Sequence, residues 1–152
     1  MDKTAEDAIE KLLKNKDLNF QKGDSDDFIT NRIPFNVPAL DLLTGGGIPF
    51  KKMTLIYGPT NVGKSYLASQ IVVNAQKMGG KAVWVDTELS YDKDWMATCG
   101  VDSQKILVSQ PTTGEEALEH IREAMIAGFE VIVLDSIAGL VPTNVAEEDF
   151  GF

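Results

Sequence analysis

The chain has 152 residues, 43% of them hydrophobic, which suits one α/β domain with its own core and leaves little room for a second. Its formal net charge of −9 argues against a protein that grips nucleic acid over its whole surface, because such surfaces are usually basic. A single cysteine, Cys99, excludes an intrachain disulfide, and no N-terminal apolar stretch resembles a signal peptide or a membrane span. We therefore expect a reducing, cytoplasmic compartment and no membrane partner.

The N-terminal stretch reads as an appendage to the core. Residues 4–16 predict a charged amphipathic helix, with Thr4 as its N-cap. Its apolar face consists of Ala8, Ile9, Leu12 and Leu13. Residues 17–31 mix Asn, Gly, Ser and Asp without a period, which indicates a linker, so we expect the core to begin near Arg32.

From residue 32 onward, strand and helix patterns alternate. A short helical turn broken by three glycines, within residues 40–49, comes first. The expected strands are residues 53–57, 82–86, 105–109 and 131–135, and the expected helices are residues 65–78, 92–99 and 114–127. Such alternation predicts parallel strands joined by crossover helices.

The last of these helices has clear start and stop signals. Thr113 can serve as its N-cap, with Glu116 as a capping-box partner, and Gly128 ends it. Its one histidine, His120, is expected to be solvated or partly buried.

A phosphate-binding motif stands between the first expected strand and the helix that follows it. Residues 58–65 read Gly-Pro-Thr-Asn-Val-Gly-Lys-Ser and fit the pattern G-x-x-x-x-G-K-[ST] at every fixed position. The glycines let successive backbone N–H groups point at a phosphate, and the helix adds the positive end of its dipole. The residues expected to bind nucleotide here are Gly58, Pro59, Thr60, Asn61, Val62, Gly63, Lys64, Ser65 and Tyr66. The alternative is a glycine turn between a strand and a helix.

Specific roles follow for two residues of the motif. Lys64 is expected to reach the β- and γ-phosphates, and the Ser65 hydroxyl to ligate Mg²⁺. Residues 131–135 are four apolar residues followed by Asp135, the form of a Walker B strand, whose carboxyl end is where ligands of open α/β sheets sit. Asp135 can hold Mg²⁺ through its water shell opposite Ser65. The alternative is an apolar strand that ends in Asp without a role.

Two more carboxylates, Asp86 and Glu88, follow the strand at residues 82–86. Hydrolysis of a γ-phosphate needs a carboxylate that orients or deprotonates the attacking water, and Glu88 is the candidate. The pair favours an ATPase over a nucleotide kinase, with Glu88 and Lys64 as catalytic residues. A solvated loop carboxylate is the alternative for Glu88.

On these motifs the chain resembles the RecA-type recombinases of bacteria and phages, from about Ile33 to Phe152. The stretches that carry the resemblance are residues 55–59 (LIYGP), 100–102 (GVD), 109–111 (SQP) with 113–115 (TGE), and 135–138 (DSIA). The resemblance implies a RecA-like P-loop NTPase fold with ATP and Mg²⁺ as cofactors, in which Glu88 is the catalytic glutamate. It also implies that Asp92 binds the adenine amino group and that Trp95 stacks on the adenine, where the family has a tyrosine. Trp95 as a core or interface aromatic is the alternative.

At the level of function, the resemblance implies a DNA-dependent ATPase that forms filaments on single-stranded DNA and promotes homologous strand exchange. The N-terminal helix, within residues 1–31, would pack on a neighbouring subunit, and residues 32–152 would form the ATP-binding core. The family's two DNA-binding loops and a strand between the phosphate-loop strand and the Walker B strand come from beyond Phe152. We therefore expect an N-terminal part of a longer recombinase, or a truncated gene product, with an incomplete sheet.

Two other classes of protein remain open at this point. One is a short, self-contained module that uses ATP only as an assembly switch and hydrolyses it weakly or not at all. The other is a hexameric helicase-type motor, which shares the nucleotide site. Glu88 favours hydrolysis over the switch, and residues 109–111 with Asp92 and Trp95 favour the recombinase over the helicase.

Overall fold

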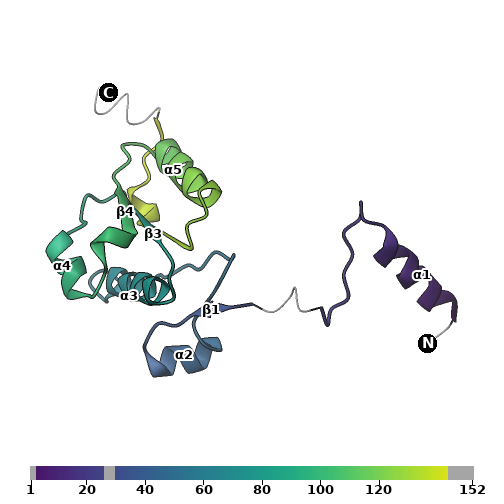
Figure 1. Ribbon diagram of the computed structural model, residues 1–152. Helices are drawn as coiled ribbons and strands as arrows, with labels where there is room; N and C mark the ends of the chain where they lie inside the picture. Colours follow the sequence, from purple (N-terminus) through teal and green to yellow (C-terminus); the bar gives the residue numbers. More distant parts are fainter. Residues whose placement is uncertain (1–2, 26–29, 144–152) are drawn as a thin grey trace. The chain divides into compact units, whose positions relative to one another are not determined.

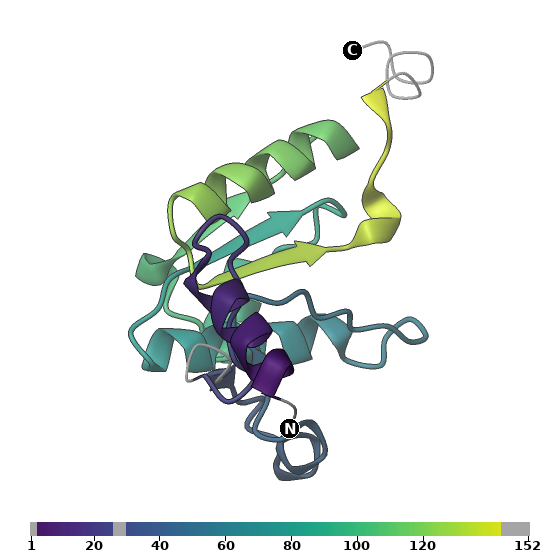
Figure 2. The ribbon, with the colours of Figure 1, turned by 90° about the vertical axis from the view of Figure 1, so that its right-hand side faces the viewer.

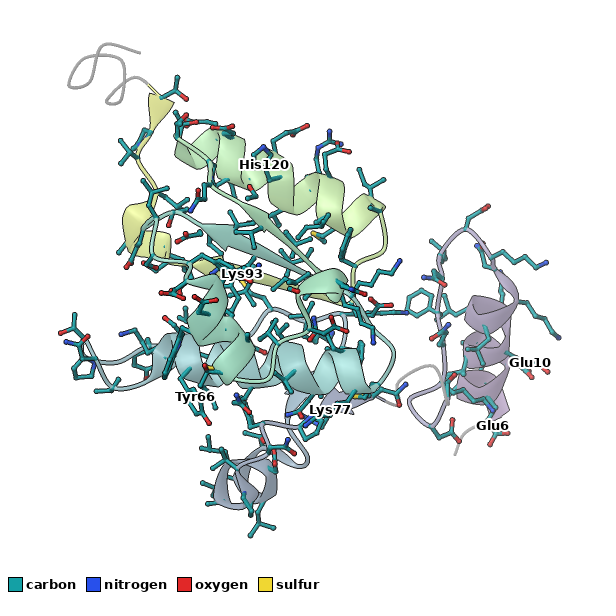
Figure 3. The ribbon with its side chains drawn as sticks, turned by 60° about the vertical axis from the view of Figure 1, so that its left-hand side comes forward. Glu6, Glu10, Tyr66, Lys77, Lys93 and His120 are labelled. Atoms are coloured by element: carbon teal, nitrogen blue, oxygen red, sulfur yellow. The ribbon has the colours of Figure 1, made fainter. Side chains whose placement is uncertain are left out.

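The computed structural model describes residues 3–25 and 30–143, and the chain divides into two compact units, residues 1–31 and 32–152. The first unit contains helix α1, Lys3–Lys14 (Figure 1). The helix starts at Lys3, so Thr4 lies inside its first turn and the N-cap prediction for Thr4 was wrong. Helix ends fray, and the local sequence therefore predicts the exact terminal residue poorly. Figure 3 shows Glu6 and Glu10 on the same side of α1, and Glu10 pairs with Lys14 at 3.2 Å. The apolar Ile9 and Leu12 are exposed.

The second unit is built on a parallel three-stranded sheet, which confirms the predicted α/β class. Strand β3, Ala82–Asp86, lies between β4, Ile106–Ser109, and β5, Val131–Asp135. Ala82 is in register with Ile106 and Val131, and Asp86 with Asp135. Every residue of β3 is buried, as expected of a central strand covered on both faces.

Helices cover the two faces of this sheet. Helix α3, Lys64–Lys77, and helix α5, Gly114–Ile126, lie on opposite faces (Figure 2). Because side chains alternate along a strand, Trp84 joins the apolar cluster on the α3 side, whereas Val83 and Val85 pack with α5. Helix α4, Lys93–Thr98, and the short 3₁₀ helix η2, Ser103–Lys105, connect β3 to β4, and a second 3₁₀ helix, η3, Ile137–Gly139, follows β5.

The predicted ends of α5 are largely confirmed. The Thr113 hydroxyl accepts from the Glu116 N–H at 3.2 Å, and Gly128 follows the helix with φ of +78°. The capping box differs in one contact: the Glu116 carboxylate accepts from the N–H of Thr112 at 2.7 Å instead of from Thr113. Both bonds join the first turn of α5 to the residues just before it, so they still define where the helix starts.

The strand predicted at residues 53–57 does not form. This segment follows a small antiparallel pair, β1 (Arg32–Ile33) with β2 (Ile48–Pro49), and helix α2, Pro38–Thr44, but it forms neither a helix nor a strand. Met53 is 98% and Tyr57 85% exposed, although Ile56 packs on the α3-side core. A strand needs a hydrogen-bonding neighbour, and no segment in the described ranges pairs with this one. Among the residues that the structure describes, the parallel sheet therefore contains β4, β3 and β5 alone.

None of the helices in the described ranges has both the length and the apolar character needed to cross a membrane.

Candidate nucleotide-binding site

The loop at residues 58–63 leads directly into the first turn of α3. Gly63 adopts a left-handed conformation with φ of +91°, and so does Asn61 at +61°. A Cβ added at Gly63 would meet nothing within 4 Å, so this position needs glycine for its backbone angles and has open space beside it. The first N–H groups of a helix lack partners within the helix, and no side chain caps them here. The loop thus presents backbone donors and a helix N-terminus to an anion.

The side chain of Lys64 folds back over this loop. Its Nζ donates to the carbonyl oxygen of Pro59 at 2.8 Å. Ser65 and Tyr66 follow on the first turn of α3 and are exposed. Figure 3 shows Tyr66 at the N-terminal end of α3, with Lys77 at the opposite end. The one ammonium group of the motif therefore lies at the loop, as a phosphate contact requires.

The loop lies at the same side of the sheet as two of the predicted carboxylates. In Figure 2 the segment before α3 extends toward the side at which β3 and β5 end. Asp135 is the last residue of β5 and is half-buried, and Glu88 lies two residues beyond the end of β3 and is exposed. The carboxyl ends of neighbouring parallel strands are where open α/β proteins bind ligands.

Glu88 is tied to the segment that follows Asp135. The hydroxyl of Ser136 donates to Glu88 Oε1, and the Thr87 N–H donates to the carbonyl oxygen of Asp135 at 3.0 Å. The peptide bond between Asp135 and Ser136 is cis. The structure thus brings Glu88 beside the Walker B segment, and Thr87 and Ser136 make the connection.

Asp86 is buried, unlike Glu88. Its carboxylate accepts from the N–H groups of Ser90 at 3.0 Å and Tyr91 at 2.9 Å, and from Nε2 of Gln110 at 3.0 Å. Burial raises the pKa of the Asp86 carboxyl, but the hydrogen bonds, chiefly from Gln110, outweigh burial and hold the pKa below its usual value. Asp86 therefore stays ionised and anchors the loop that carries Glu88. The sequence did not assign this role, although an Asp within an apolar run signals a buried, paired carboxylate.

The two residues expected at the adenine lie together at the start of α4. Asp92 is the N-cap of this helix, and its Oδ1 accepts from the N–H of Trp95 at 2.8 Å. Trp95 is 53% exposed, so the alternative of a core aromatic was wrong, whereas that of an interface aromatic is not tested by its exposure. Trp84 is the tryptophan that is buried in the core, and Tyr91 lies edge-on to it with the two ring centroids 6.2 Å apart. No hydrogen bond within the described ranges ties Asp92 or Trp95 to the loop at 58–63.

His120 is half-buried, within the range that the sequence predicted. Its Nδ1 lies 2.5 Å from the Ser109 hydroxyl and its Nε2 3.8 Å from the Glu116 carboxylate. It lies on α5, and these contacts give it no link to the phosphate loop.

A phosphate loop at the start of a helix, beside parallel strands that end at acidic residues, defines a P-loop nucleotide-binding protein. Residues 3–151 match the family model of the RecA N-terminal domain. The chain therefore belongs to the RecA family.

Similar proteins support this assignment. Protein RecA of Herpetosiphon aurantiacus is 43% identical over 153 residues, which cover 96% of this chain and 43% of the relative. Protein RecA of a Roseiflexus species is 47% identical over 122 residues, 78% of this chain and 34% of the relative. Protein RecA of Paenarthrobacter aurescens is 40% identical, covering 96% of this chain and 44% of the relative. The chain thus spans less than half the length of these relatives.

Proposed function

We propose that this chain is the ATP-binding core of a DNA-dependent ATPase recombinase. The observation that carries the proposal is the phosphate loop at the start of α3, at the side of the sheet where β3 and β5 deliver Glu88 and Asp135. The residues fit Mg·ATP: the open space at Gly63 and the uncapped first turn of α3 suit a phosphate.

Each residue of the site has a distinct part in binding. Lys64 would exchange its bond to Pro59 for a charge-assisted bond to a phosphate oxygen. Ser65 and Asp135 would hold the magnesium ion, Asp135 through water. Asp92 would accept from the adenine amino group and Trp95, already exposed, would stack on the ring. The other contacts would come from Gly58, Pro59, Thr60, Asn61, Val62, Gly63 and Tyr66.

Glu88 would orient the water that attacks the γ-phosphate. Mg·ATP, when bound, would supply the phosphoryl group, and its magnesium ion would neutralise the negative charge that develops on the phosphate oxygens. Within the part of the chain that the structure describes, Ser136 bonds to Oε1 of Glu88 and no bond engages Oε2, which could therefore accept a hydrogen from the water. Because the carboxylate is exposed, a water molecule can reach it.

The recombinase role extends the proposal to partners. Membership of the RecA family supports assembly into a filament on single-stranded DNA and homologous strand exchange, in the cytoplasm. We assign assembly to residues 1–31, whose helix α1 exposes an apolar face, and ATP binding to residues 32–152. Because the chain has a net charge of −9 and DNA-binding surfaces are usually basic, we assign the DNA contacts to segments outside these residues.

The test compares Lys64→Ala and Glu88→Gln, with Lys77→Ala as a control, against the full-length parent protein. Lys64→Ala should weaken binding of a fluorescent Mg·ATP analogue about 10- to 100-fold, because it removes a charged hydrogen bond. Lys77→Ala, at the other end of α3, is the matched control. Glu88→Gln should bind normally while turnover with single-stranded DNA falls about 10²- to 10⁴-fold. Unchanged affinity in Lys64→Ala would contradict the site, and negligible turnover in the parent would favour the switch module.

A further inference from the structure

The link between β3 and β5 continues beyond the last paired residues of these strands. The Thr87 hydroxyl donates to the carbonyl oxygen of Ser136 at 2.7 Å and accepts from the N–H of the same residue at 2.9 Å. One side-chain hydroxyl therefore satisfies both backbone polar groups of Ser136. An aliphatic side chain of the same shape could make neither bond.

Gly139, at the end of η3, holds Thr87 from another direction. A Cβ built on Gly139 would lie 2.5 Å from the Thr87 hydroxyl oxygen and 2.8 Å from the Thr87 carbonyl oxygen. Both separations are too short for non-bonded atoms, so the turn approaches Thr87 this closely only because position 139 lacks a side chain. The Thr87 hydroxyl is thus fixed by hydrogen bonds and by packing.

Ser136 in turn holds the carboxylate of Glu88. The Ser136 side chain is half-buried and its hydroxyl donates to Glu88 Oε1, whereas Glu88 itself is exposed. The direction of the exposed carboxylate therefore depends on Ser136. The backbone of Ser136 is held by Thr87 and also by the N–H of Gly139, which donates to the Ser136 carbonyl oxygen at 3.2 Å.

We infer that Thr87 is a positioning residue for ATP hydrolysis, acting through Ser136 on Glu88. The inference rests on the proposed function, because it concerns the step in which Glu88 orients water. A shift of about 1 Å in a reacting group can lower a rate about 100-fold. The hydrogen bonds of Thr87 go to the segment after β5 and not to the phosphate loop, so nucleotide affinity should not change with it.

The test uses a pair of variants that differ in the hydroxyl. Thr87→Val keeps the shape and removes the hydroxyl, and should lower kcat about 10- to 100-fold while KM for ATP stays within about twofold. Thr87→Ser restores the hydroxyl and should restore kcat. Thr98→Val is the matched control, because among the described residues the Thr98 hydroxyl bonds only to the carbonyl oxygen of Asp94, at 2.9 Å. Gly139→Ala, which places a methyl group against Thr87, should reproduce the loss in kcat.

A second measurement needs no nucleotide. Amide hydrogen exchange at Ser136 should become about tenfold faster or more in Thr87→Val, but not in Thr87→Ser, because only valine removes the acceptor. Parent-like exchange in Thr87→Val would overturn the link, and parent-like kcat despite faster exchange would overturn the positioning role alone. A parent that binds no Mg·ATP would overturn the proposed function and this inference with it.

Discussion

Asp86 is a buried carboxylate beside the candidate site, and it accepts several hydrogen bonds. Its two oxygens hold Ser90, Tyr91 and Gln110, so the loop after β3 and the chain after β4 meet on one charge. Because its pKa is held below the usual value, the charged form is the one that stabilises the fold.

We predict that Asp86→Asn lowers the free energy of unfolding by about 1–3 kcal/mol at neutral pH, since donors lose a charged acceptor. The folded pKa lies below the ordinary 3.8, so this stabilisation is complete above that value and disappears as pH falls through the folded pKa. Urea unfolding at neutral and acidic pH measures it: parent and variant should converge in acid. Asp94→Asn, on the exposed side of α4, is the control, and a pH-independent difference would contradict the assignment.

Trp95 offers a direct optical test of the adenine site. If it stacks on the base, saturating Mg·ATP should quench the tryptophan emission of the parent and leave that of Trp95→Phe unchanged. The second tryptophan, Trp84, is buried and serves as an internal reference. Base stacking on an aromatic ring contributes about 1–3 kcal/mol in single-strand nucleic-acid sites, as measured by replacement with alanine. This range is the guide to the affinity for ATP that a Trp95→Ala variant would lose. Equal quenching in both proteins would remove Trp95 from the site.

At the scale of elements, α5 depends on its first turn. Thr113→Ala removes the hydroxyl that accepts from Glu116 and should lower the free energy of unfolding by about 1 kcal/mol. Urea unfolding measures this, with Thr98→Ala as a control at an exposed helix end. A loss below a few tenths of a kcal/mol would mean that the Glu116 bond to Thr112 suffices to start the helix.

The elements also show what a sequence can reveal. Helix α5 and the phosphate loop were predictable because their signals, a cap or a glycine pattern, lie within a few consecutive residues. The segment at residues 53–57 has the composition of a strand, but a strand forms only when another segment pairs with it. The sequence of the segment itself does not show whether such a partner is present.

The candidate site divides in the same way. Lys64, Glu88 and Asp135 became candidates on the basis of their neighbours in the sequence, and their roles stay predictions. The contact of Thr87 with Ser136 joins residues 49 positions apart, and the bond of Gln110 to Asp86 joins residues 24 apart. Neither could be predicted without the register of β3 against its neighbours.

At the scale of the whole molecule, the apolar face of α1 should mediate self-association. We predict that Ile9→Glu weakens it, because a charge replaces an exposed apolar contact, whereas Asp7→Asn, on the opposite side of the helix, leaves it unchanged. Sedimentation at fixed ATP and low salt, together with a form that lacks residues 1–20, provides the measurement. Undiminished assembly without the helix would contradict the assembly role of α1.

The order of β3, β4 and β5 along the chain also sets an order of events during synthesis. Helices α3 and α4 and the β3–β4 pair are complete in sequence before β5 leaves the ribosome. At about 5–20 residues per second, the 49 positions between Thr87 and Ser136 correspond to roughly 2–10 s of translation. During this interval one edge of the central strand is open to other chains, and Glu88 has no Ser136 to hold it. Among the three strands that the structure describes, β5 is therefore the last to join, and slow translation before residue 131 would lengthen the period in which the nascent chain can mispair.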